Sequence, residues 1–191
     1  LNLFDAKKRE FPLKIDMFDF GRKKFYYLSP LKYMQLYENA FDNKLMEALF
    51  DELENTIVTR YKDLLCCNRQ SINEHNQKSK LKQMYHLVLI NLNNFPTKEF
   101  NLRRIKNFVE SAHKAGIYVI AFANQDIEQS ENETTQAILQ HFKKIKVTQG
   151  KFAITEDIFE FTELLDDHTF ESLNHDKNGL MQKVLTNADI G

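Results

Sequence analysis

A short apolar run that ends in asparagines, Leu-Val-Leu-Ile-Asn-Leu-Asn-Asn-Phe at residues 87–95, constrains the fold more than any other stretch of this sequence. Its apolar part, Leu87 to Leu92, is too short for a buried helix and too apolar for an edge strand. It therefore predicts the central strand of a parallel sheet covered on both faces. Such sheets place ligands at the carboxyl ends of their strands. At that position the chain carries amides, where an enzyme that cleaves phosphate bonds is expected to carry carboxylates.

Length and composition indicate one folded domain. The chain has 191 residues, 42% of them hydrophobic, and a formal net charge of −1. A charge so close to neutrality excludes attraction of the whole domain to nucleic acid or to an anionic membrane, so any such contact has to be local. No apolar run approaches the roughly 20 residues that span a bilayer, and no signal peptide opens the sequence. Because the chain begins with Leu1 rather than Met, we expect a domain of a longer protein, whose other parts can include a membrane anchor.

Residues that commonly bind metals or act as nucleophiles form no recognisable site in the sequence. The six histidines are scattered and make no zinc motif, so we expect no metal site. Cys66 and Cys67 are adjacent, which strains any disulfide between them, and two cysteines cannot fill a four-ligand zinc site. We expect them to be buried thiols in a reducing compartment. The five glycines form neither a P-loop nor a dinucleotide-binding motif.

The first half of the chain predicts a strand and a long helix. Residues 13–20 alternate between apolar and polar, which indicates a strand, and a second short apolar piece at 25–28 ends at Ser29-Pro30. The three cations at 22–24 could grip a phosphate or simply occupy a surface turn. Residues 42–65 predict a helix capped by Asp42 or Asn43 and packed on the sheet through one apolar stripe, formed by Met46, Leu49, Phe50, Leu53, Ile57, Tyr61, Leu64 and Leu65. The polar residues 68–82 predict a loop with a short helical turn.

The middle of the chain predicts a parallel strand–helix–strand unit. A helix begins near Pro96-Thr97 and ends at Gly116, which suits a left-handed cap, and residues 117–123 form a second buried strand. Asn124, Gln125 and Asp126 then follow at the same edge of the sheet as Asn93 and Asn94.

The remaining residues predict smaller elements. Residues 134–142 predict a helix after a loop at 128–133, and residues 144–147 and 152–154 predict a hairpin at the sheet edge. Residues 157–165 have helical spacing through Ile158, Phe161 and Leu165. We expect a charged lead-in at 1–12, one domain at 13–165 and a polar tail at 166–191 that contains a weakly amphipathic segment.

Several of these pieces, in this order, resemble the FtsK/SpoIIIE-type P-loop ATPases over roughly residues 13–147. The strand end Phe18-Asp19-Phe20, the helix from Glu54 to Arg60-Tyr61 and the loop at 73–76 resemble the segments that precede the Walker B strand in that family. Residues 111–125 resemble its "Ala-Gly-Ile-His" turn and the strand that ends in "Ala-Thr-Gln". The resemblance implies a RecA-like three-layer α/β fold with a mainly parallel central sheet, the P-loop part being absent from this chain.

Residue by residue, the resemblance places amides where the family has its catalytic acids. Asn93 and Asn94 fall on the Walker B Asp-Glu, with Asn91 as the alternative register. Gln125 matches the sensor glutamine, and Asn124 replaces its neighbouring threonine. Asp126 stands where the family usually has arginine, and residues 156–161 lack the arginine often found there. Because an amide supplies neither the negative charge that holds Mg²⁺ nor a proton acceptor, the resemblance implies a domain that has lost hydrolysis.

Degenerate domains of this family occur in the EssC/EccC coupling ATPases of type VII protein secretion, where they are associated with substrate recognition and motor control. The resemblance therefore favours a domain of a membrane-tethered cytoplasmic motor, with other ATPase domains of the same chain and a secreted protein as partners and no membrane insertion of its own. We expect no firmly bound cofactor, ATP and Mg²⁺ being at most weakly held in the parent protein. One alternative is a fragment of a DNA-translocating ATPase. Another is a Rossmann-like interaction module, which a sheet that separates residues 13–20 from 87–92 would favour.

Overall fold

The computed structural model describes residues 13–20, 26–66, 68–96, 99–129, 133–148 and 151–154, in which strands and helices largely alternate. In chain order the elements are β1 (Leu13–Phe18), the 3₁₀ helix η3 (Tyr26–Lys32), β2 (Tyr37–Ala40), α1 (Asn43–Asp63), α2 (Ile72–Lys78), β3 (Tyr85–Asn91), the 3₁₀ turn η4 (Leu92–Asn94), α3 (Glu99–Ala112), β4 (Ile117–Phe122), α4 (Gln125–Glu128), α5 (Glu133–Leu139), β5 (Ile145–Thr148) and β6 (Lys151–Ile154).

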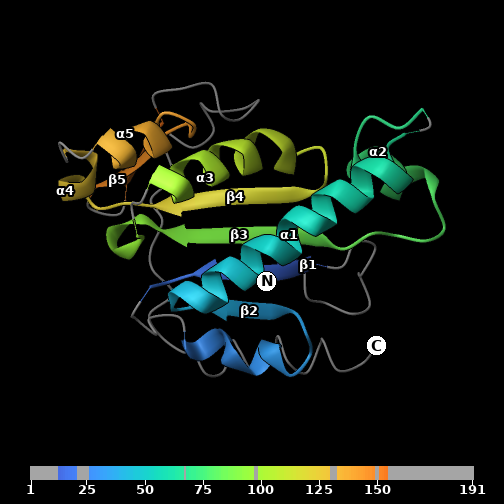
Figure 1. The fold of residues 1–191 in the computed structure, drawn as a ribbon, viewed down its shortest axis with the longest axis horizontal. Coiled ribbons are helices and arrows are strands. Elements are labelled where there is room, and N and C mark those ends of the chain that lie inside the picture. The colour runs from blue at the N-terminus through green and yellow to red at the C-terminus, as the bar shows by residue number, and fades with distance from the viewer. Residues whose placement is uncertain are drawn as a thin grey trace.

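Four strands form one parallel sheet in the order β2-β1-β3-β4 (Figure 1). The predicted central strand is confirmed, since β3 lies between β1 and β4, although it begins two residues earlier than residue 87 and ends one earlier than residue 92. β1 pairs directly with β3, so the sheet order does not favour the unrelated Rossmann-like module. The predicted α/β class with a parallel sheet is confirmed.

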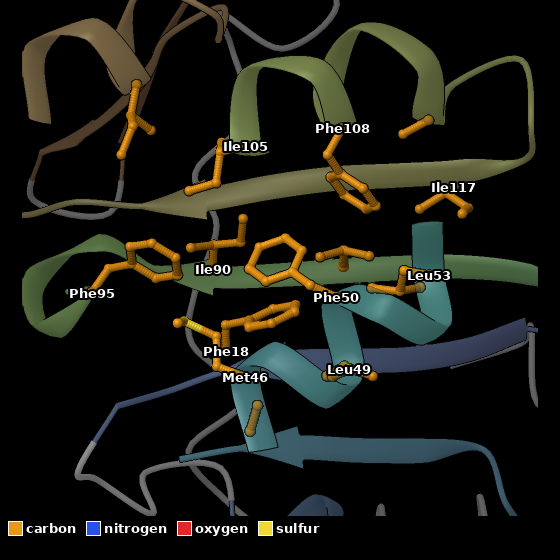
Figure 2. Close-up of a cluster of buried hydrophobic side chains, with 14 of the residues drawn as sticks. Phe18, Met46, Leu49, Phe50, Leu53, Ile90, Phe95, Ile105, Phe108 and Ile117 are labelled. Atoms are coloured by element: carbon orange, nitrogen blue, oxygen red, sulfur yellow. The ribbon is translucent and has the colours of Figure 1, made fainter. Parts of the chain in front are cut away.

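Helices α1 and α3 pack on one face of this sheet and form the larger core (Figure 2). Phe50 of α1 lies between Phe18 of β1 and Phe108 of α3, with ring centroids 4.5 and 5.6 Å away. The predicted stripe of α1 is buried from Met46 to Ile57, whereas Tyr61 is 38% exposed. Burying such aromatic and aliphatic side chains is the main force that holds both helices on the sheet.

A smaller core lies on the opposite face of the sheet, where η3 covers β1 and β2. Its members come from both strands, from η3 and its following turn, and from β3: Ile15, Met17, Leu31, Leu36, Tyr37 and Leu89. The sheet is thus covered on both faces over β1, which gives the predicted three-layer arrangement.

The strand–helix–strand unit formed by β3, α3 and β4 agrees with the prediction. α3 ends at Ala112, and the chain turns through residues 113–116 into β4. Gly116 has φ +74°, the left-handed conformation that glycine adopts at low cost. A Cβ atom there would also lie 2.9 Å from Ile72 Cγ2 of α2, so glycine additionally allows α2 to approach this turn.

Two local predictions were incomplete or wrong, and one strand was missed. The short apolar piece at 25–28 does not end at Ser29-Pro30, because η3 continues through Pro30, whose fixed φ fits a 3₁₀ helix. The polar stretch 68–82 contains α2, a full helix of seven residues. β2 was not predicted, because its sequence Tyr-Glu-Asn-Ala has no alternating pattern.

Three further predictions were only partly right or wrong, two of them at the β4 side of the sheet. Residues 145–148 and 151–154 form the predicted antiparallel hairpin, yet β5 and β6 make a separate two-stranded sheet rather than an edge of the main one. β4 was expected to be a buried strand, but among the described strands it pairs only with β3, and alternate side chains are exposed. Cys66, expected to be buried, is exposed.

Some predictions fall on residues outside those described: the lead-in 1–12, the cations 22–24, the helical spacing at 157–165 and the tail 166–191. Within the described ranges, no helix is both long and apolar enough to cross a membrane.

Candidate functional site

The parallel register brings the carboxyl ends of β1, β3 and β4 together at one edge of the sheet. Phe18 pairs with Ile90, and Asn91 pairs with Phe122, so the residues that follow these strands become neighbours. Asp19 follows β1, and Asn124 lies just beyond β4. This is the edge where the sequence places its candidate site residues.

Asn91, the last residue of β3, is a buried hub at this edge. Its Nδ2 donates to Asp19 Oδ1 over 2.8 Å. Its Oδ1 accepts two hydrogen bonds from Asn93, one from the backbone N at 3.2 Å and one from Nδ2 at 2.9 Å. Asn91 and Asp19 are 5% and 1% exposed, so their polar atoms depend on partners inside the protein. The side chain that was the alternative Walker B register is thus the one at the centre of the contacts.

Asn93 extends this chain of contacts to the next strand. Its Oδ1 accepts a hydrogen bond from the backbone N of Asn124 at 2.8 Å. The predicted proximity of Asn93 and Asn124 is confirmed. We call the connected set Asp19, Asn91, Asn93 and Asn124 the strand-end amide network; it joins three strand ends that are far apart in sequence.

The other predicted residues lie beside this network. Asn94 is partly buried, and its Nδ2 is buried without a hydrogen-bond partner. Gln125 is exposed and begins α4, and Asp126 is exposed within the same short helix. The structure therefore joins Asn93 and Asn124 through a hydrogen bond, while Asn94 and Gln125 lie next to them in the chain.

The network has limited capacity for metal chemistry. Mg²⁺ prefers carboxylate oxygens and water, and the oxygens of Asn91 and Asn93 already accept hydrogen bonds from neighbouring N–H groups. Asp19, the carboxylate of the network, accepts from Asn91 and is almost fully buried. No cluster of three or more metal-binding side chains occurs among the residues that the structure describes.

Sequence reasoning missed the role of Asp19. It is part of the Phe18-Asp19-Phe20 strand end that resembles the family, and an acid directly after an apolar strand is the signal that could have marked it. Its partner is 72 positions away, so the contact itself could not be read from spacing.

Buried polar contacts also hold the opposite, amino-terminal edge of the sheet. The guanidinium of Arg60, at the end of α1, donates to the backbone oxygens of Ala115 and Met84, each over 2.6 Å. Burial lowers the pKa of Arg60 to about 10. Under α1, His86 Nδ1 lies 2.6 Å from Asp16 Oδ2. These groups fix the strands that carry the amide network at their other end.

Comparisons with known proteins point to one kind of fold. No protein-family model matches the sequence, and no curated protein is similar enough in sequence to match it. Among solved structures, EssC (ATPases 2 and 3) from Geobacillus thermodenitrificans is similar with a TM-score of 0.56 and 16% identity, over 85% of this chain and 30% of that one. The cytoplasmic domain of EssC is similar with a TM-score of 0.54 and 17% identity, over 71% of this chain and 27% of that one.

A third similar structure is the cytoplasmic domain of the type VII secretion ATPase EccC from Thermomonospora curvata. Its TM-score is 0.56 and its identity 12%, over 94% of this chain and 24% of that one. The chain thus spans less than a third of each of these structures. At such low identity the likeness establishes the fold, and it agrees with the resemblance seen in the sequence. This chain has the α/β fold of a part of the type VII secretion ATPases EssC and EccC, consistent with the expected RecA-like fold.

Proposed function

We propose that this chain is a non-hydrolysing domain of a type VII protein secretion motor, in which it acts in substrate recognition or in control of the motor. The observation that carries the proposal is the strand-end amide network. Where a hydrolysing domain of this fold needs acids that are open to Mg²⁺ and water, this chain has amides that bind one another.

The chemistry of these positions supports loss of hydrolysis. With Asn93 and Asn94 in place of the Walker B acids, these two positions offer no negative charge for the Mg²⁺ water shell and no base to polarise an attacking water. The carboxylate of the network, Asp19, is 1% exposed and accepts a hydrogen bond from Asn91. Taking Asn91 as the alternative register leads to the same conclusion, because its oxygen already accepts two hydrogen bonds. In this proposal Asn124 and Gln125 stand at the sensor positions of the family but no longer respond to the γ-phosphate of ATP.

The same likeness supports our proposal for where in the cell, and in what kind of protein, the domain acts. The solved structures come from proteins with several ATPase domains or from their cytoplasmic parts. We therefore assign this chain to the cytoplasmic side of a membrane-tethered motor. Its partners are other ATPase domains of the parent chain and a secreted protein, and any ATP or Mg²⁺ is held weakly.

The proposal is tested by measuring phosphate release from Mg-ATP by the full chain. The expected turnover lies far below the roughly 1 to 100 per second of typical phosphoryl-transfer enzymes. Turnover within that range, abolished by Asn93→Ala, would show that the edge is an active site and that the assignment is wrong.

A second measurement separates protein secretion from DNA translocation. Binding of the chain to duplex DNA is measured at low and at moderate salt. We expect no binding that weakens steeply with salt, because the formal net charge is −1. Tight binding with a steep salt dependence would instead support a fragment of a DNA-translocating ATPase.

A further inference from the structure

One face of β4 is apolar and lacks a covering layer among the described residues. Ile117, Val119 and Ala121 point towards the larger core. The alternate side chains Tyr118, Ile120 and Phe122 are 39%, 46% and 42% exposed. Strands of parallel sheets carry apolar side chains on both faces because both faces are normally covered. The sequence of β4 is thus that of a strand with a second cover.

A groove of about 680 Å³ runs along this strand. Its walls come from the end of α3, from β4 and from β5, whose Ile145 and Val147 are 39% and 61% exposed. The lining is mainly apolar, and this size is within the range of sites that bury a few large side chains. Among the described residues that line it, His113, His141 and Lys143 are basic or titratable and none is acidic. Lys114, Lys144 and Lys146 are exposed and adjoin lining residues in sequence. The groove therefore suits an apolar segment that carries negative charge.

The chain itself supplies a segment with these properties directly after the described hairpin. β6, the partner of β5, ends at Ile154, so the next residues start one strand away from the groove wall. Residues 155–167 contain five large apolar side chains and six acids, and no lysine or arginine occurs between Phe152 and Asp176. Helical spacing of Ile158, Phe161 and Leu165 would place these three side chains on one face.

We propose that residues 155–167 of this chain dock in the groove along β4, with Phe161 and its apolar neighbours against Ile120 and the acids facing the basic rim. The segment is tethered to β6, so its contact with the groove is intramolecular. This favours the segment over a second copy or another protein that offers the same side chains to the groove. The inference rests on the groove and on the sequence, and it is independent of the proposed function.

A cross-linking experiment on the full chain tests this placement. In a background with both native cysteines replaced by serine, Ile120→Cys and Thr162→Cys, which leaves the anchor Phe161 in place, are combined and treated with a short bis-maleimide. The control pairs Thr162→Cys with Val58→Cys, which is 63% exposed on α1 at the opposite face of the sheet. We expect at least roughly tenfold more cross-linked monomer for the 120–162 pair than for the control. Equal yields would overturn the proposal, and cross-linked dimer alone would assign the groove to a second copy.

Hydrogen exchange provides a readout that does not depend on cysteine. Phe161→Asp is expected to speed exchange in β4 and β5 while leaving β1 unchanged, because an acid in place of the apolar anchor disfavours docking. Phe170→Asp, outside the proposed segment, is the matched control and is expected to leave β4 unchanged. Identical exchange in β4 for wild type and Phe161→Asp would contradict the docking.

Discussion

Asn91 shows how one buried side chain can hold several segments at a strand end. It donates to Asp19 after β1 and accepts from Asn93 in η4, which in turn accepts from Asn124 beyond β4. The position of these residues at one edge could be predicted from the apolar strands that precede them. Their connections could not, because hydrogen bonds between residues far apart in sequence depend on register and rotamer.

Removing this hub is expected to destabilise the protein. Asn91→Ala deletes the donor to Asp19 and the acceptor of two bonds from Asn93 in a buried setting, so we expect a loss of about 2–3 kcal/mol in the free energy of unfolding. Asn91→Asp keeps the shape but sets a second carboxylate against Asp19, and we expect it to be at least as damaging.

Urea denaturation measures both changes. The matched control is Asn55→Ala, at an exposed position of α1, which is expected to change stability little. If Asn91→Ala were as stable as wild type, the amide network would not be a structural element.

Arg60 has a comparable role at the amino-terminal edge, where it binds the backbone oxygens of Ala115 and Met84. Arg60→Met keeps much of the volume but leaves two acceptors without this donor, so we expect a loss of roughly 2–4 kcal/mol. Although burial lowers the pKa of Arg60 to about 10, the group stays charged at neutral pH, so the loss should be constant from pH 6 to 8. Thermal unfolding at several pH values checks this, with the exposed Arg103→Met as control. A loss that varied strongly with pH in that range would contradict the assignment.

At the scale of elements, the apolar periodicity predicted α1, α3 and the strands β1, β3 and β4. It failed for elements whose stability comes from caps and neighbours. β2 is a strand because β1 pairs with it, and α2 is a helix because its first turn is capped. The signal for α2 was present in the sequence, since Ser71 and Glu74 have the spacing of a capping box.

The hydrogen bonds of Glu74 in the first turn of α2 predict that its contribution to stability depends on pH. Glu74 accepts a hydrogen bond from the backbone N of Gln70 at 2.7 Å, and this bond, followed by the one from Lys78, lowers the pKa of Glu74. A carboxylate whose pKa is lowered by folding stabilises the protein above its ordinary value of 4.5, and this contribution is lost as the pH falls through the folded-state pKa.

We therefore expect Glu74→Gln to lower the melting temperature at pH 7, and this difference from wild type to shrink as the pH falls below about 4.5. Melting curves at pH 7, 5, 4 and 3 measure the difference, with Glu47→Gln on the exposed side of α1 as control. A difference that stays the same at every pH would show that the charge of Glu74 does not cap the helix.

For the whole molecule, the fold class was predictable because buried parallel strands leave a strong apolar pattern. The exposure of one face of β4 was not predictable, because its sequence is as apolar as that of a strand covered on both faces. The low identity of 12–17% to EssC and EccC structures also explains why the fold is clear while the role of the domain rests on its edge residues.

The central claim is that the strand-end amide network is closed by its own hydrogen bonds and does not serve as a Mg-ATP site. The most direct test is a titration of the full chain, labelled at asparagine side-chain amides, with Mg-ATP while NMR follows the signals of Asn91 and Asn93. The account predicts that both signals stay unchanged up to millimolar nucleotide and exchange slowly with solvent. Saturable shifts of these two signals, absent when Mg²⁺ is omitted, would contradict it.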